Sequence, residues 1–192
     1  MFYVLGGWTQ ILSVKSNTSN INQFLTRSFT RWTNLTGFSP SGNYMIEPSA
    51  LKNSTLVGGK TQMRFHCSLP NSSPTKTLHL VTTKDSYGKA VVNWLTGRST
   101  IRPAACNSYK RLPGDNSYIS QHCSSWNTGG ATWGKPDITI PLKDFFIDHM
   151  MFVSGKGHWN LYESTDLPNR FECDNERTNV IQIGDFWQIY VR

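Results

Sequence analysis

The residues best suited to binding chemistry are aromatic and amide side chains in the second half of the chain. A sugar site needs a flat apolar face for the C–H surface of the ring and a few directed polar groups for its hydroxyls. The predicted ligand site therefore consists of Trp126, Asn127, Trp133, His158, Trp159, Asn160 and Tyr162. The alternative is that most of these aromatic side chains lie in the core, as large aromatics usually do.

Carboxylates at alternating positions near the end of the chain form a second chemical group. If this segment is extended, Glu172, Asp174 and Glu176 project from one face and offer oxygen ligands to calcium. The alternative is a solvated acidic edge that balances neighbouring arginines. Calcium is thus the candidate cofactor.

Signatures of catalysis are scarce. The sequence contains no HExxH, GxxxxGK[ST], GxSxG or GxGxxG motif. Cys123 is a candidate nucleophile with His149 or His158 as its base, but the spacing to either histidine is far too short for a papain-like site. His66 and His79 could meet across a hairpin. We expect a binding protein and no enzyme, with a secreted hydrolase as the alternative from a different class.

Four cysteines occur without CxxC spacing, which excludes zinc-ribbon and thioredoxin-like arrangements. Two disulfides are expected. The turn-forming residues 113–116 would bring Cys106 and Cys123 together, and Cys67 would then pair with Cys173. The alternative is four buried free thiols in a cytosolic protein.

Composition favours an extracellular setting. The 192 residues are only 16% charged and rich in Ser, Thr, Asn and Gly, which is typical of a secreted protein or of the outer face of a membrane protein. The net charge is +7, but Lys and Arg are scattered, so we expect no specific nucleic-acid site. No apolar run approaches the roughly 18 residues of a membrane span.

Four Asn-x-Ser/Thr sequons, which are acceptors for N-linked sugars in secreted proteins, fall within the first seventy-three residues. They begin at Asn17, Asn34, Asn53 and Asn71. Their confinement to one part of the chain suggests one sugar-bearing face. Pro74 directly follows the last sequon and makes it the poorest acceptor.

The elements that must position these groups are mostly strands. Period-two alternation predicts strands at 10–14, 44–47, 61–69, 77–82, 137–142, 145–153, 158–163, 169–173 and 186–191. Apolar residues at helical spacing predict one amphipathic helix from Asn20 to Trp32, and Gly88 to Leu95 suits a helix or a strand. From Arg98 to Lys135 the periodicity disappears, and a disulfide can staple this loop region.

The predicted fold is therefore α+β and mainly β. It has antiparallel sheets, one or two short helices and a long disulfide-stapled loop region. The length fits a single domain over residues 1–192, which we expect to come from a longer protein.

The start of the chain adds a resemblance. Gly6-Gly7-Trp8-Thr9, leading into the first strand, resembles the segment of fibrinogen-related domains and intelectins in which a glycine-rich turn precedes a tryptophan-led strand. The family's upstream cysteine-containing stretch is absent, so the N-terminal part of the family domain is missing. The family's later signature, an Asp-x-Asp calcium loop and a Gly-Gly-Trp-Trp motif with its flanking cysteine, is also absent.

This resemblance implies an extracellular recognition module for glycans or acetylated groups on glycoproteins, sometimes with calcium, in adhesion, matrix or innate defence. The alternative within binding is a structural module of a secreted matrix protein, whose partner is another protein or a second copy of the chain.

Overall fold

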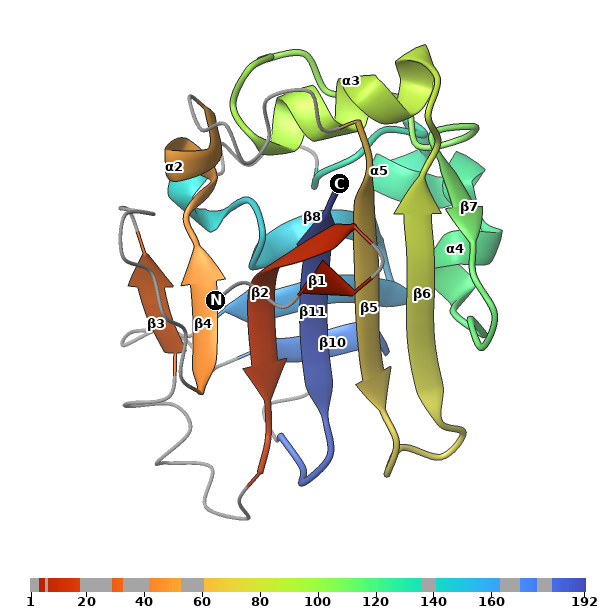
Figure 1. The fold of residues 1–192 in the computed structure, drawn as a ribbon. Coiled ribbons are helices and arrows are strands. Elements are labelled where there is room, and N and C mark those ends of the chain that lie inside the picture. Colours follow the sequence, from red (N-terminus) through yellow and green to blue (C-terminus); the bar gives the residue numbers. More distant parts are fainter. Residues whose placement is uncertain are drawn as a thin grey trace.

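The structure, a computed structural model, describes residues 4–5, 7–17, 29–32, 42–52, 61–135, 141–162, 170–175 and 181–192. Its main element is a large sheet with the strand order β3-β4-β2-β11-β5-β6-β7, in which β1 also pairs with β2 (Figure 1). All described pairings in this sheet are antiparallel except β3 with β4. The strands are β1 (Val4–Leu5), β2 (Trp8–Lys15), β3 (Phe29–Trp32), β4 (Asn43–Ile46), β5 (Met63–Leu69), β6 (Lys76–Thr82), β7 (Tyr109–Arg111) and β11 (Phe186–Val191).

A small antiparallel sheet forms the second layer. It has the order β10-β9-β8 and lies behind the large sheet in Figure 1, with its strands running across those in front. Its strands are β8 (Asp148–Val153), β9 (Gly157–Tyr162) and β10 (Arg170–Asn175). The mainly β architecture with antiparallel sheets confirms the predicted fold class.

Short helices occupy the edges of the two layers. They are α2 (Pro48–Lys52), α3 (Ser86–Leu95), α4 (Tyr118–Gln121) and α5 (Trp126–Gly129), with 3-10 turns η1 (Cys123–Ser125) and η2 (Leu142–Asp144). The side chain of Asp85 caps α3 by accepting from the backbone N–H groups of Tyr87 and Gly88. A Cβ at Gly88 would lie 2.0 Å from the carbonyl oxygen of Thr83, so only glycine lets α3 begin this close to the end of β6.

The hydrophobic core lies between the two sheets. Alternate residues of β5 and β11 point inward, among them Phe65, Trp187 and Ile189, and all three are fully buried. From the small sheet, Trp159 contacts Phe65 edge to face, with ring centroids 6.2 Å apart. Aromatic packing thus joins the two layers.

No helix among the described residues is long and apolar enough to cross a membrane.

Both predicted disulfides are confirmed. Cys106 is bonded to Cys123, and Cys67 on β5 is bonded to Cys173 on β10. The first closes the segment 106–123, which contains β7 and α4, and the second links the two sheets. All four cysteines are oxidised, which fits an extracellular protein.

Most predicted strands are confirmed, and β11 has the predicted bounds. The segment with two readings, Gly88 to Leu95, is helical. The helix predicted from Asn20 to Trp32 is wrong at its end, because residues 29–32 form β3 beside β4; residues 20–28 lie outside the described part. Strand β8 begins only at Asp148, after a turn at residues 145–147.

Two further predicted segments differ from expectation. Of the strand predicted over 137–142, residues 137–140 lie outside the described part and Leu142 begins η2. The region from Arg98 to Lys135 is stapled as expected, but it also contains β7, α4, η1 and α5. Elements of three or four residues are too short to produce a detectable period.

Candidate functional site

The three tryptophans predicted to bind a sugar lie in the core. Trp126, Trp133 and Trp159 are fully buried, so no ring face is accessible, and the prediction that they form the ligand site is wrong. Each indole N–H donates internally: Trp126 to the carbonyl of Ile119 (2.8 Å), Trp133 to the hydroxyl of Ser108 (2.9 Å) and Trp159 to the carbonyl of Phe146 (2.9 Å). The alternative stated from the sequence, that these aromatics form the core, is the one that the structure supports.

The other predicted ligand residues lie apart from these indoles. His158 and Asn160 flank Trp159 on β9, and because side chains alternate along a strand they project from the opposite face of the small sheet. Asn127 is half-buried and its amide contacts the hydroxyl of Thr132. The side chain of Tyr162 lies outside the described part.

The predicted calcium ligands do not share a face. A bulge between Cys173 and Asn175 interrupts the alternation of β10, and Asp174 has a φ of 58°. Both oxygens of Asp174 are turned to the start of α4, where they accept from the N–H groups of Tyr118 (2.6 Å) and Ile119 (2.7 Å). Glu172 points elsewhere, and Glu176 lies outside the described residues.

A different set of ligand groups converges on the small sheet. His149 on β8, His158 on β9 and Glu172 on β10 each bring one potential metal-binding atom within 4.8 Å of the others. All three side chains are buried. We call these three residues the His-His-Glu cluster. From the sequence, His158 is predicted for the sugar site and Glu172 for the calcium site, and their association with His149 is missed because the three residues have no spacing typical of a metal motif.

Charge and hydrogen bonds hold the cluster together. Arg170 donates to Oε1 of Glu172 from Nε (3.0 Å) and Nη2 (2.7 Å), and Oε2 lies 3.1 Å from Nδ1 of His158. Burial acts to raise the pKa of Glu172, but the hydrogen bonds from His158 and Arg170 outweigh it and hold the pKa at about 2. Burial lowers the pKa of His149, although its contact with the carboxylate of Asp148 opposes the shift. The cluster therefore contains an ionised carboxylate and a neutral His149 at neutral pH.

One atom of the cluster is unsatisfied. Nε2 of His158 is buried and has no hydrogen-bond partner among the described residues, although its other ring nitrogen lies 3.1 Å from both Glu172 and Arg170. Phe152 stacks on the same imidazole, with ring centroids 4.7 Å apart. A buried polar atom without a partner lowers the stability of the fold by roughly 1–3 kcal/mol, so a ligand that contacts Nε2 would recover this free energy.

The outer face of the large sheet, which points away from the core, carries a second polar arrangement. Tyr44 donates its hydroxyl to Gln10 (3.0 Å), Gln10 donates to the hydroxyl of Tyr190 (3.2 Å), and Tyr190 donates to Gln188 (2.9 Å). This chain crosses from β4 through β2 to β11. The guanidinium of Arg64 lies 5.2 Å from the ring centroid of Tyr190 and makes a cation–π contact with it.

The predicted meeting of His66 and His79 is confirmed on this face. The two residues are directly opposite on β5 and β6, and their rings stack at 4.1 Å. His79 has both nitrogens engaged, Nε2 by Arg64 (2.9 Å) and Nδ1 with the carbonyl of Pro113 (3.0 Å). The pair is therefore a packed part of the surface and does not offer two ring nitrogens to a metal.

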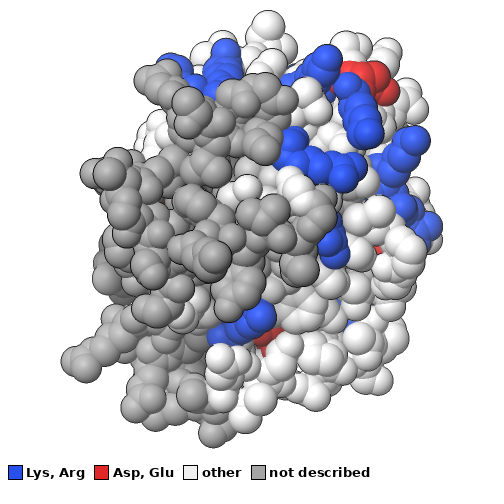
Figure 2. All heavy atoms as spheres, viewed as in Figure 1, with Lys and Arg blue, Asp and Glu red and all other residues white. Residues whose placement is uncertain are grey.

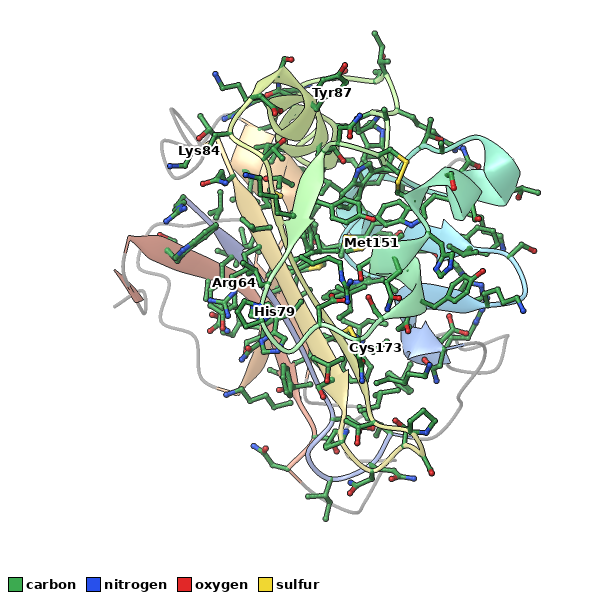
Figure 3. All side chains as sticks on the ribbon, turned by 90° about the vertical axis from the view of Figure 1, so that its right-hand side faces the viewer. Arg64, His79, Lys84, Tyr87, Met151 and Cys173 are labelled. Carbon is green, nitrogen blue, oxygen red and sulfur yellow. A yellow bond between two sulfur atoms is a disulfide. The ribbon has the colours of Figure 1, made fainter. Side chains whose placement is uncertain are left out.

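A basic hollow lies at one end of this outer face, beside the start of α3. Its volume is about 440 Å³ and it is lined by Gln62, Val81, Thr82, Thr83, Lys84, Asp85 and Lys110. Figure 2 shows Lys and Arg side chains across the described part of this face with few acidic groups, and in Figure 3 Arg64 and Lys84 lie toward the same side of the large sheet. The hollow combines two exposed lysines with hydroxyl and amide groups.

Cations also flank the hollow. Arg64 and Lys110 lie on either side of Val81 in adjacent strands, so their side chains share the outer face. Arg192 donates to Oε1 of Gln62 from Nε (3.1 Å) and Nη2 (2.9 Å). The guanidinium of Arg192 also lies 4.4 Å from the ring centroid of Trp8, which fixes its position.

No family model, curated protein or solved structure matches this chain. The resemblance to fibrinogen-related domains and intelectins stays a prediction. The two sites are therefore judged on their own chemistry.

The structure describes two of the four sequon asparagines. Asn17 and Asn71 are both exposed. The amide of Asn71 donates to the carbonyl of Ile183 (2.7 Å), which occupies the nitrogen that would carry a sugar. Asn34 and Asn53 lie outside the described residues.

Proposed function

We propose that this chain is an extracellular recognition module that binds anionic glycans, such as sulfated or carboxylated sugars, at the basic hollow. The observation that carries the proposal is the placing of Lys84 and Lys110 in one hollow, with Arg64 and Arg192 beside it. The two disulfides support an extracellular setting.

The charge balance of the hollow favours an anion. Asp85 is the carboxylate that lines it among the described residues, and its Oδ1 accepts from the hydroxyl of Thr83 (2.7 Å) and from the first N–H groups of α3. The hydrogen bond from Thr83, with those from the backbone, lowers the pKa of Asp85. This carboxylate is engaged by the helix, and four cations, Lys84, Lys110, Arg64 and Arg192, line or flank the hollow against its single negative charge.

Size and composition favour a sugar as the carrier of the anionic group. A volume of about 440 Å³ lies within the range of small-ligand sites. Aromatic rings lie beside the arginines, Tyr190 under Arg64 and Trp8 under Arg192. The lysines provide direct charge contacts, so the proposed binding needs no calcium.

The test is a binding titration with a sulfated glycosaminoglycan and its desulfated form. The double variant Lys84→Glu/Lys110→Glu should weaken binding of the sulfated chain by roughly ten-fold or more, since it reverses two contacting charges. Affinity should fall steeply with salt, as it does for other polyanions. The desulfated chain should bind weakly to both proteins.

A matched control is a double variant at two other exposed lysines, Lys89→Glu/Lys156→Glu, which changes the net charge equally. Neither Lys89 nor Lys156 lines the hollow. Equal losses in the two double variants would show diffuse attraction to the whole basic surface and would overturn the proposed site. Equal affinity for DNA and the sulfated glycan at the same salt concentration would overturn the choice of ligand.

A further inference from the structure

We infer that the small sheet carries a binding site for a divalent transition-metal ion of the zinc type, ligated by His149, His158 and Glu172. One ligand comes from each of three hydrogen-bonded neighbouring strands, and all three side chains are buried. The inference is independent of glycan binding, because the basic hollow lies on the outer face of the other sheet.

The donor atoms select the class of metal. Two imidazole nitrogens and one carboxylate oxygen form a ligand set that zinc and related ions prefer, whereas calcium takes oxygen ligands almost exclusively. The ligand atoms lie within 4.8 Å of one another. In a tetrahedral zinc site they would be roughly 3.4 Å apart, so a pair at the upper limit of 4.8 Å has to close by about 1.4 Å.

The unsatisfied nitrogen of His158 is the independent sign that a ligand belongs there. If Nδ1 carries the proton and donates to Glu172, Nε2 has a buried lone pair without a donor; if Nδ1 accepts from Arg170, Nε2 has a buried N–H without an acceptor. Neither tautomer satisfies the ring. A metal ion takes the lone pair of one ring nitrogen, so that the other nitrogen carries the proton and acts only as a donor.

Groups around the ligands support the same chemistry. Asp148 contacts Nδ1 of His149, and the amide nitrogen of Asn160 lies 3.4 Å from Nε2 of that ring, so an ion bound at Nε2 would replace this long contact with Asn160. A carboxylate behind a metal-binding histidine is a common way to fix its tautomer. The carboxylates of Glu172 and Asp148 balance the charges of Arg170 and Lys135 around the cluster, and Glu172 is the carboxylate that would bind the ion itself.

The backbone under the site is also held firmly. Trp187 donates its indole N–H to the carbonyl of Glu172 (3.0 Å), and the next residue, Cys173, is bonded to Cys67. Glu172 is paired with Asn160 on β9. The position of the carboxylate is thus fixed from two sides before any ion binds, which reduces the cost of assembling the site.

The experiment is metal loading of chelator-treated protein with Zn²⁺ or Co²⁺. After removal of free metal, elemental analysis should find one equivalent of Zn²⁺ per chain, and Zn²⁺ should raise the melting temperature because only the folded state presents the site. Co²⁺ should give the visible absorption of a tetrahedral nitrogen and oxygen site. Ca²⁺ should change neither readout.

Variants identify the ligands. His149→Gln and His158→Gln should each lower the affinity for Zn²⁺ by at least ten-fold, whereas His66→Gln and His122→Gln, which alter other histidines, should keep it. If a cluster variant fails to fold, the Co²⁺ spectrum and the stoichiometry of the wild-type protein still decide. Absence of bound metal in the wild-type protein, or loss of binding in His66→Gln alone, would overturn the inference.

Discussion

Cys67 and Cys173 join the two layers of the protein directly beside Glu172. Cys67 lies on β5 opposite Trp187 in the register of the large sheet, and Trp187 donates to the carbonyl of Glu172. One disulfide and one indole hydrogen bond therefore support the strand that carries the carboxylate of the His-His-Glu cluster. The stability of the fold and the order of this site are coupled through β10.

Removal of this disulfide should lower the free energy of unfolding by about 4–5 kcal/mol, because the bond closes a segment with a sequence separation of 106 residues. The variant is Cys67→Ala/Cys173→Ala, measured by denaturant unfolding. The Cys106–Cys123 bond closes a separation of only 17 residues, so Cys106→Ala/Cys123→Ala should cost about 3 kcal/mol. Peptide mapping without reduction should show both links, and alkylation of four cysteines in the native protein would contradict the extracellular assignment.

Replacement of Trp126 should affect stability and leave glycan binding intact. The indole is fully buried, stacks on Tyr109 at 5.4 Å and meets Trp133 at 5.0 Å. Trp126→Ala should therefore cost about 3–5 kcal/mol of unfolding free energy. The control is Tyr87→Ala at a residue 52% exposed on α3, which should change stability by less than about 0.5 kcal/mol. If the Trp126→Ala protein is stable, unfolds cooperatively and binds the glycan more weakly, Trp126 belongs to the ligand site after all.

The fold could be predicted largely because its strands have one buried and one exposed face. Strand β11 is the clearest case: Trp187, Ile189 and Val191 are buried and alternate with half-buried residues, and this alternation can be recognised in the sequence without knowing which strands pair with β11.

The segment from Phe29 to Trp32 shows the limit of this approach. The spacing of its apolar residues is typical of a helix, but the segment pairs with β4 and is a strand of the large sheet. Pairing with a neighbouring strand can thus outweigh the helical pattern of a short segment.

The candidate sites could be predicted less well, since they depend on strand order. His149, His158 and Glu172 have no spacing typical of a metal motif and meet only because β8, β9 and β10 are neighbours. Lys110 and Lys84 meet at the hollow because β7 adds to the edge of the large sheet. Composition identifies the aromatic residues but does not distinguish a buried tryptophan from an exposed one.

Asp174 should act as a structural anchor that is indifferent to calcium. Its carboxylate accepts from two backbone N–H groups at the start of α4, and burial raises its pKa although these bonds oppose the shift. Asp174→Ala leaves both donors without this acceptor and should cost about 2–3 kcal/mol. Calorimetry should give the same melting temperature with calcium and with a calcium chelator, for the wild type and the variant. A calcium-dependent rise that Asp174→Ala abolishes would restore the calcium site.

Acid should weaken the fold through His66. Burial, followed by the charges of His79 and Arg64, lowers the pKa of His66 from 6.5 to about 4. The folded protein therefore binds this proton less readily than the unfolded chain, so the contribution to stability is present above pH 6.5 and is lost as the pH falls toward 4. The loss should reach roughly 1–3 kcal/mol.

The measurement is urea unfolding at several pH values between 7 and 4 for the wild type and His66→Gln. Glutamine also removes the stacking on His79 and the edge contact with Phe186, so the variant should be less stable at pH 7, and the slope with pH is the quantity to compare. Carboxylates titrate in both proteins and cancel in the difference between them. The slope should flatten in His66→Gln; equal slopes in the two proteins would contradict the role given to His66.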